Sequence, residues 1–349
     1  MRDLSYLSEV MPAWFRANAR ALPWRENAEP YRVWLSEIML QQTRVEAVIG
    51  YYKRFLDALP DLKSLAAAPE SQVLKLWEGL GYYSRARNLQ KAARVIVNDR
   101  GGSFPDTYPE ILALPGVGPY TAGAIASICF DEPTPAVDGN VLRVVSRLET
   151  IAGSVDSPGV RTAVREALLP AYRPGLCGVM TQSLMELGAC VCVPNGAPRC
   201  EACPVRDRCA ACQTGTWDKY PVRDAKKPRK RIDKCVLLLR RGERFAVRKR
   251  PEKGLLAGLW EFPWIDADEQ ARRDPRTALT QAEGLGAKPV APILQTDYTH
   301  VFTHVEWHMT AHLIDCGEAP DAFTWVTPEE LTRDYALPSA FRPFLVCLK

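Results

Sequence analysis

The sequence predicts two domains, an all-α domain followed by a smaller α+β domain. Over the first part of the chain, apolar residues recur three and four positions apart, as in "VWLSEIMLQQTRVEAVIGYYKRFLDAL", which is the spacing of one helix face. Beyond a basic stretch the chain changes to short apolar or alternating runs typical of strands, such as "KCVLLLR" and "HVEWHMTAHLI". With 349 residues, of which 47% are hydrophobic, the chain is long enough to build two separate cores.

The change of pattern sets the domain boundaries at residues 1–212, a linker at 213–232, and 233–349. From Lys219 to Arg250 there are 14 Lys and Arg residues against three acids, a composition that fits a solvated linker or contact with a polyanion. No apolar run reaches membrane-spanning length, and the N-terminal stretch lacks the apolar core of a secretion signal. We therefore expect a cytoplasmic monomer with no membrane partner.

A helical hairpin is predicted at residues 107–130, "TYPEILALPGVGPYTAGAIASICF". Thr107 with Glu110 fits a capping box, and "PGVG" supplies a tight turn before a helix that starts at a proline. Two glycines leave this turn without bulky side chains, so its N–H groups at a helix N-terminus are free to approach an anion. Gly116, Val117 and Gly118 are therefore candidates for holding a DNA phosphate without reading sequence.

Two carboxyl groups stand out in the helical part. Asp138, in "PAVDGNVLRVVSRL", precedes an apolar-periodic helix and is placed to cap it. Glu37 lies among large apolar residues in "VWLSEIMLQQT", and burial there would keep it protonated at neutral pH. One neutral acid and one ionised carboxylate are what cleavage of a glycosidic bond requires, as a proton donor and as a stabiliser of the cationic sugar.

Residues 190–212 hold six of the eleven cysteines. A disulfide knot is disfavoured in a reducing compartment, which leaves a structural zinc site or an iron–sulfur cluster. Spacing alone fits zinc, with Cys200 and Cys203 paired with Cys209 and Cys212. Both metals fit these cysteines.

In the second domain, the strand run "HVEWHMTAHLI" alternates. Trp307, Met309, Ala311 and Leu313 fall on one face, which we expect to meet the core. A final helix is predicted to open at Thr327, with Glu330 completing a capping box.

Taken together, several motifs resemble the MutY-type adenine DNA glycosylases of the helix-hairpin-helix superfamily: "WLSEIMLQQT", "GLGYYSRARNL", "LPGVGPYTAGAIAS", "VDGNVLRV", "ELGACVC" with the cysteine run, and "GLLAGLWEFP". The resemblance covers nearly the whole chain. It implies a helix-hairpin-helix glycosylase domain with an iron–sulfur loop and a Nudix-like C-terminal domain. It also implies a structural [4Fe–4S] cluster on Cys192, Cys200, Cys203 and Cys209, whose first gap is seven residues where the family has six.

The resemblance further implies a substrate and residue roles. The partner is double-stranded DNA with adenine opposite 8-oxoguanine or guanine, from which the adenine is flipped out. Glu37 would protonate N7 of adenine, Asp138 would stabilise the sugar cation, and Tyr120 and Asn140 would orient this pair. The remaining matches are Trp24, Arg25, Leu40 and Gln182 in the adenine pocket, Gln42 and Tyr82 beside the 8-oxoguanine, and Phe302, Thr303 and His304 as readers of the oxidised base.

Position 120 indicates that the enzyme is monofunctional. Strand-cleaving relatives carry a lysine there that attacks the sugar as an amine, whereas this chain carries tyrosine. Two other functions are compatible with these residues: a pyrimidine-specific glycosylase of the endonuclease III type, and a non-catalytic DNA-binding protein stabilised by zinc.

Overall fold

The computed structural model describes residues 1–225, 227–318 and 320–348. It divides into two compact units, one formed by Met1–Ala68 and Asn88–Ala225 and the other by Pro69–Arg87 and Lys226–Lys349. Among the described residues, no helix is long and apolar enough to cross a membrane.

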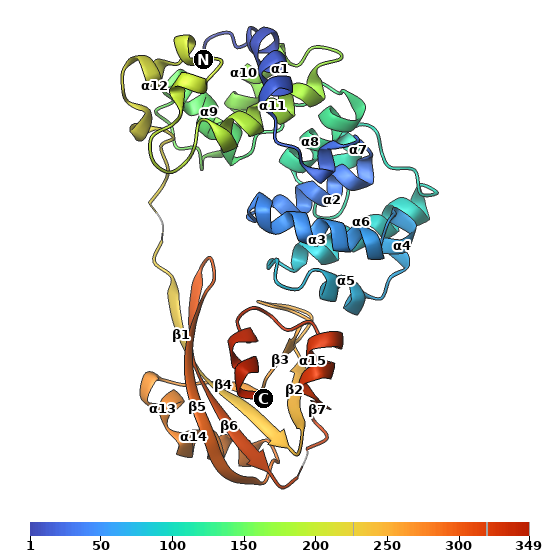
Figure 1. Cartoon of the computed structure of the whole chain (residues 1–349), viewed down its shortest axis with the longest axis vertical. Helices are drawn as coiled ribbons and strands as arrows, with labels where there is room; N and C mark the ends of the chain where they lie inside the picture. Colours follow the sequence, from blue (N-terminus) through green and yellow to red (C-terminus); the bar gives the residue numbers. More distant parts are fainter. Residues whose placement is uncertain (226, 319, 349) are drawn as a thin grey trace. The chain divides into compact units, whose positions relative to one another are not determined.

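The first part of the chain is helical, as predicted (Figure 1). Its helices are α1 (Leu7–Asn18), α2 (Pro30–Leu40), α3 (Val45–Ala58), α4 (Leu62–Ala67), α5 (Glu70–Leu76), α6 (Ser84–Asp99), α7 (Tyr108–Leu112), α8 (Pro119–Phe130), α9 (Gly139–Glu149), α10 (Pro158–Leu168), α11 (Cys177–Cys190) and α12 (Ala210–Gln213).

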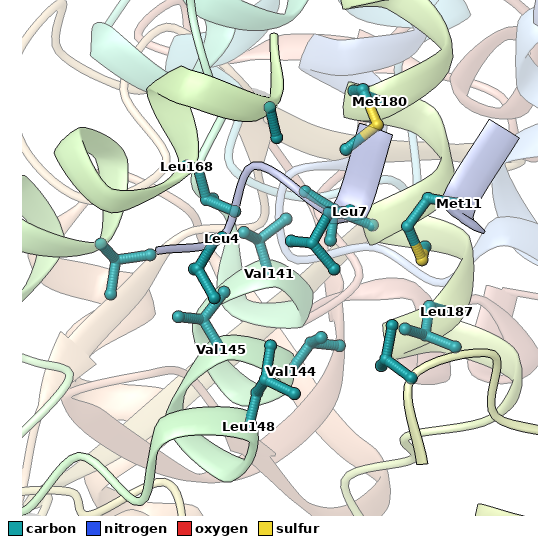
Figure 2. Packing of buried hydrophobic residues seen from close by; sticks show 14 of the residues in the cluster. Leu4, Leu7, Met11, Val141, Val144, Val145, Leu148, Leu168, Met180 and Leu187 are labelled. Carbon is teal, nitrogen blue, oxygen red and sulfur yellow. The ribbon is translucent and has the colours of Figure 1, made fainter. Parts of the chain in front are cut away.

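One core of the helical unit is built where α1, α9, α10 and α11 meet (Figure 2). Helix α9 contributes apolar side chains at helical spacing to this core, and every residue from Val141 to Leu148 is buried. Leu4 and Leu7 enter the same cluster from the N-terminal segment, which ties the start of the chain to α9. This packing fixes the first turn of α9, where Asp138 is located.

The predicted hairpin is formed by α7 and α8. Gly116 has φ +74°, and a Cβ there would lie 2.4 Å from the Cβ of Asn88, so the turn requires glycine. The predicted capping box is wrong, because the Thr107 hydroxyl donates to the Glu110 carboxylate at 3.0 Å. The first free N–H of α7, on Tyr108, instead donates to the Glu132 side chain at 2.6 Å.

The second unit contains a mixed seven-stranded sheet of order β3-β2-β1-β6-β5, with β4 paired to β1 and β7 to β2. Strands β1 and β6 run parallel, whereas the other pairs are antiparallel. The elements are β1 (Lys230–Arg241), β2 (Arg244–Lys249), β3 (Trp260–Glu261), β4 (Trp264–Asp266), α13 (Glu269–Arg273), α14 (Pro275–Gly284), β5 (Pro289–Val301), β6 (Val305–Cys316), β7 (Thr324–Val326) and α15 (Pro328–Asp334).

Both faces of this sheet are covered, which explains why the middle of β1, residues 235–239, is apolar without interruption. Cys235, Leu237 and Leu239 pack with α14 on one face. Val236 and Leu238 pack on the other face, in the cluster that includes α15 and the C-terminal turns.

Strand β6 places its predicted apolar residues in the core on the α15 face, and the capping box of Thr327 and Glu330 is present. Strand β1 starts at Lys230, within the stretch expected to be linker. The segment Pro69–Arg87 packs with the C-terminal residues, since Glu78 accepts the Leu337 N–H at 2.8 Å and Lys75 donates to the Tyr335 carbonyl at 2.9 Å.

Candidate active site

A cavity of about 170 Å³ lies in the helical unit. Glu37, Tyr120, Asp138 and Asn140, which are far apart in the sequence, all line it. The predicted pocket residues Trp24, Arg25, Leu40 and Gln182 line the same cavity.

Glu37 is the buried acid of this cavity. It lies on α2, a helix whose start is capped by the Glu29 carboxylate and whose side chains are buried on nearly every face. Only 6% of Glu37 is exposed. Burial raises its pKa to about 7, against the opposing effect of a hydrogen bond donated by the Tyr120 hydroxyl. A carboxyl group with this pKa is protonated in about half of the molecules at neutral pH.

Tyr120 stands on the first turn of α8, one residue after the proline that starts the helix. Its hydroxyl donates to Oε2 of Glu37. Burial raises the pKa of Tyr120 well above its ordinary value, and the neighbouring carboxyl groups of Glu37 and Asp138 add to the effect. The phenol therefore stays neutral and keeps its proton as a donor to Glu37.

Asp138 caps α9, as its sequence position predicts. Its Oδ1 accepts the Val141 N–H at 2.8 Å and its Oδ2 accepts the Asn140 amide at 2.7 Å. Burial raises the pKa of Asp138, and these hydrogen bonds oppose the rise because they favour the ionised form. The cap thus holds a carboxylate in a fixed orientation at the wall of the cavity.

Arg143 supports Asn140 from behind and was not identified from the sequence. Its Nη2 donates to Oδ1 of Asn140 at 2.8 Å and to the Gly188 carbonyl at 2.6 Å, and its Nε donates to the Cys192 carbonyl at 2.6 Å. A Cβ at position 188 would lie 2.5 Å from the Cβ of Asn140, so α11 passes close enough only with glycine there. The amide of Asn140 is therefore held at both ends.

A third carboxyl group lines the cavity and was missed by sequence reasoning, that of Glu186 on α11. It is 1% exposed and accepts hydrogen bonds from Arg20 at 2.7 Å and from Arg25 at 2.8 Å. Burial opposes its ionisation, but the two guanidinium groups outweigh burial and bring the pKa of Glu186 to about 2. The pairing also fixes Arg25, one of the predicted pocket residues.

The other predicted site residues lie outside this cavity. In the helical unit, Gln42 is exposed with φ +58°, and Gly118 caps α8 at the hairpin turn with open space around its Cα. In the other unit, Tyr82 is 45% exposed and its hydroxyl lies 2.7 Å from the Thr303 hydroxyl, so these two predicted residues are brought together.

Residues 302–304 form the turn between β5 and β6. The Phe302 N–H donates to the Val305 carbonyl at 2.8 Å, and the Phe302 ring packs against Trp307 with 4.9 Å between centroids. Arg229, from the basic stretch, donates to the Phe302 carbonyl at 3.1 Å, and the Lys230 N–H donates to the His304 carbonyl at 3.1 Å. The turn is thus tied to the start of β1.

The cysteine-rich segment forms a second, smaller cavity. Cys192, Cys200, Cys203 and Cys209 line it, together with Cys212. Nη1 of Arg147 donates a hydrogen bond to Sγ of Cys192 at 3.4 Å. Among the described residues, no three His, Cys, Asp or Glu side chains converge as the ligands of a single ion would.

Two family profiles match the chain. One, described as HhH-GPD superfamily base excision DNA repair protein, covers residues 35–170, and the other, a NUDIX domain, covers residues 235–346.

Among whole proteins, the chain is 33% identical to the adenine DNA glycosylase of Rattus norvegicus, over 97% of this chain and 77% of the rat protein. It is 33% identical to the adenine DNA glycosylase of Homo sapiens, over 91% of this chain and 69% of the human protein. It is 32% identical to that of Buchnera aphidicola subsp. Acyrthosiphon pisum, over 88% of this chain and 86% of the Buchnera protein.

Among solved structures, a thermostable thymine-DNA glycosylase has a TM-score of 0.53 with 27% identity, over 60% of this chain and 95% of that one. A non-covalent endonuclease III–DNA complex has a TM-score of 0.51 with 23% identity, over 60% and 95%, and this likeness shows the helical fold alone.

Proposed function

Because the chain belongs to the adenine DNA glycosylase family, an enzyme family of base excision repair, we propose that it removes adenine paired with 8-oxoguanine or guanine and does not cut the strand. The observation that carries this proposal is the pair of carboxyl groups in one cavity, with Glu37 tuned to hold a proton and Asp138 held by donors that favour its ionised form.

The reaction follows from these two environments. The N-glycosidic bond is not accessible inside the duplex, so the adenine leaves the stack and enters the cavity. Glu37 donates its proton to N7, which makes the base a neutral leaving group. Asp138 stabilises the positive charge that develops at C1′ before water attacks. Tyr120 and the Asn140–Arg143 pair keep the two carboxyl groups in position.

The monofunctional character is supported by the groups around the sugar. No lysine is found among the described residues that line the cavity. Leu142, where some family members carry lysine, is 1% exposed and belongs to the core of α9. Without an amine at C1′ no Schiff base forms, so borohydride should not trap the protein efficiently on DNA.

Recognition of 8-oxoguanine is proposed for the turn at 302–304 together with Tyr82. The hydroxyl pair of Tyr82 and Thr303 offers a donor and an acceptor at an exposed site, beside the ring of Phe302. Such a combination suits a base that stacks on an aromatic ring and is read at its edge. If Phe302→Ala with Thr303→Ala leaves the preference for 8-oxoguanine over guanine unchanged, this assignment is wrong.

A [4Fe–4S] cluster fits the cysteine cavity, since several soft thiol donors and a guanidinium surround one space. Cys192, Cys200, Cys203 and Cys209 would hold it. When bound, the cluster would cross-link a segment that otherwise has only short helical turns. Stoichiometric zinc, without iron, in protein purified anaerobically would refute the cluster.

The Gly116–Gly118 turn is proposed to hold a DNA phosphate. The cytoplasmic location and the monomeric state stay predictions.

The first test is base release under single-turnover conditions, comparing the wild type with Glu37→Gln. Duplexes with adenine opposite 8-oxoguanine, guanine or thymine are set beside duplexes with thymine or uracil opposite guanine. We expect adenine release from the first two, and none from the mutant. Release of the pyrimidines alone would favour the endonuclease III type, and tight binding without any release would favour a DNA-binding role.

A further inference from the structure

The cysteine cavity has five thiols for a cluster that needs four. Cys212 lines it together with the four cysteines that match the family spacing. The sixth cysteine of the segment, Cys190, does not line this cavity, and its thiol donates to Oε1 of Glu186 at 3.5 Å. One thiol at the cavity is therefore surplus to the family pattern.

Local structure explains why Cys212 faces the cavity. Cys209 caps the short helix α12, and Cys212 follows three residues later, on the same face of that helix. Cys200 starts the 3-10 turn Cys200–Ala202. The Cys200 and Cys212 side chains are hydrogen-bonded to each other, and both line the cavity.

The five thiols differ in their surroundings. Cys192, Cys203 and Cys209 pack against the core formed by α1, α9, α10 and α11. Cys200 and Cys212 are not among the described residues that pack against this core. Three thiols are thus fixed by the core, whereas the other two contact each other and are not part of that cluster.

We propose that Cys212 is a reserve ligand of the cluster that can take over the iron site of Cys200. This inference rests on the proposed cluster. In the exchange, the bond between iron and the Cys200 sulfur breaks as a bond to the Cys212 sulfur forms. The proton of the Cys212 thiol passes to the departing Cys200 thiolate, and no atom changes oxidation state. The neighbouring position of the two thiols makes the exchange possible without moving the other three.

The test replaces cysteines by alanine, which leaves no donor atom, in the full-length chain purified anaerobically. Iron and acid-labile sulfide are measured per chain for the wild type, Cys200→Ala, Cys212→Ala, the double variant and Cys203→Ala. We expect the iron content of Cys200→Ala and of Cys212→Ala to stay within about twofold of the wild type. The iron content of Cys203→Ala and of the double variant should fall at least about tenfold. Cys190→Ala is the matched control for loss of a thiol outside the cavity.

A second measurement does not depend on yield. Native protein is alkylated with iodoacetamide, and the labelled cysteines are mapped by mass spectrometry. Cys212 should be labelled in the wild type and protected in Cys200→Ala. The proposal is overturned if Cys200→Ala loses iron as completely as Cys203→Ala, if Cys212 stays labelled in it, or if Cys212→Ala alone loses the cluster. Wild-type protein without iron would instead refute the cluster itself, so the two failures are distinguishable.

Discussion

The protonation state of Glu37 makes the rate of adenine release depend on pH in a direction that the structure fixes. With a pKa of about 7, about nine tenths of the enzyme carries the proton at pH 6 and about one tenth at pH 8. In the proposed reaction, only the protonated form can donate to N7. The single-turnover rate should therefore fall about tenfold between pH 6 and pH 8.

The assay is alkaline cleavage of the abasic product on a duplex with adenine opposite 8-oxoguanine, with enzyme in excess. Binding is followed in parallel by fluorescence anisotropy, so that only fully bound enzyme is compared. Glu37→Gln should be slow at every pH and should lack this dependence. A rate that stays flat from pH 6 to pH 9 at full binding would refute the reasoning.

The raised pKa of Glu37 also predicts how the free energy of unfolding changes with pH. This dependence distinguishes a variant that has lost the acid from one whose fold is damaged. The folded pKa of Glu37 is raised above its ordinary value of 4.5, so its contribution to stability is complete below about pH 4.5 and is lost as pH rises through about 7. The full loss is about 3 kcal/mol. Glu37→Gln should therefore resist urea better than the wild type at pH 8.5, and this advantage should shrink on acidification.

Three further substitutions are expected to act through named contacts. Tyr120→Phe removes a hydrogen bond that lowers the pKa of Glu37, so the midpoint of the pH–rate profile should move to higher pH. Arg143→Gln releases the Asn140 amide and should slow base release at least about tenfold, with DNA affinity unchanged in the anisotropy assay. Leu4→Ala opens a cavity in the core of Figure 2 and should cost about 2–5 kcal/mol in urea unfolding, without changing the pH–rate profile.

The parts of the cavity that the sequence predicts are those set by local patterns. Asp138 precedes a helix with a clear apolar period, so its capping position follows from neighbouring residues alone. Glu37 sits in a run that is apolar on both sides, which indicates a buried helix. The alternation in β6 likewise gives the core-facing residues of that strand correctly.

Long-range pairing accounts for what the sequence does not show. Glu186 and Arg20 are 166 positions apart, and nothing near either residue indicates that they meet. Arg143 lies in a helix pattern where an arginine is expected at the surface, yet it is only 6% exposed. Strand β5 was missed because most of its residues are exposed and it contains two prolines, so it lacks the apolar alternation of a half-buried strand.

The cavity shows how one fold gives different charges to carboxyl groups a short distance apart. Glu37 faces a phenol and apolar residues, and so burial dominates its pKa. Glu186 is as deeply buried, but two arginines hold its pKa at about 2. The surroundings and not the burial set the charge of Glu37 and of Glu186, since burial alone would make both carboxyl groups neutral. Glu186→Gln should therefore free Arg20 and Arg25 without supplying a second acid. We expect the pH–rate profile to keep its midpoint near pH 7 while the substrate binds more weakly. That result would show that Glu186 positions the pocket arginines and does not transfer a proton.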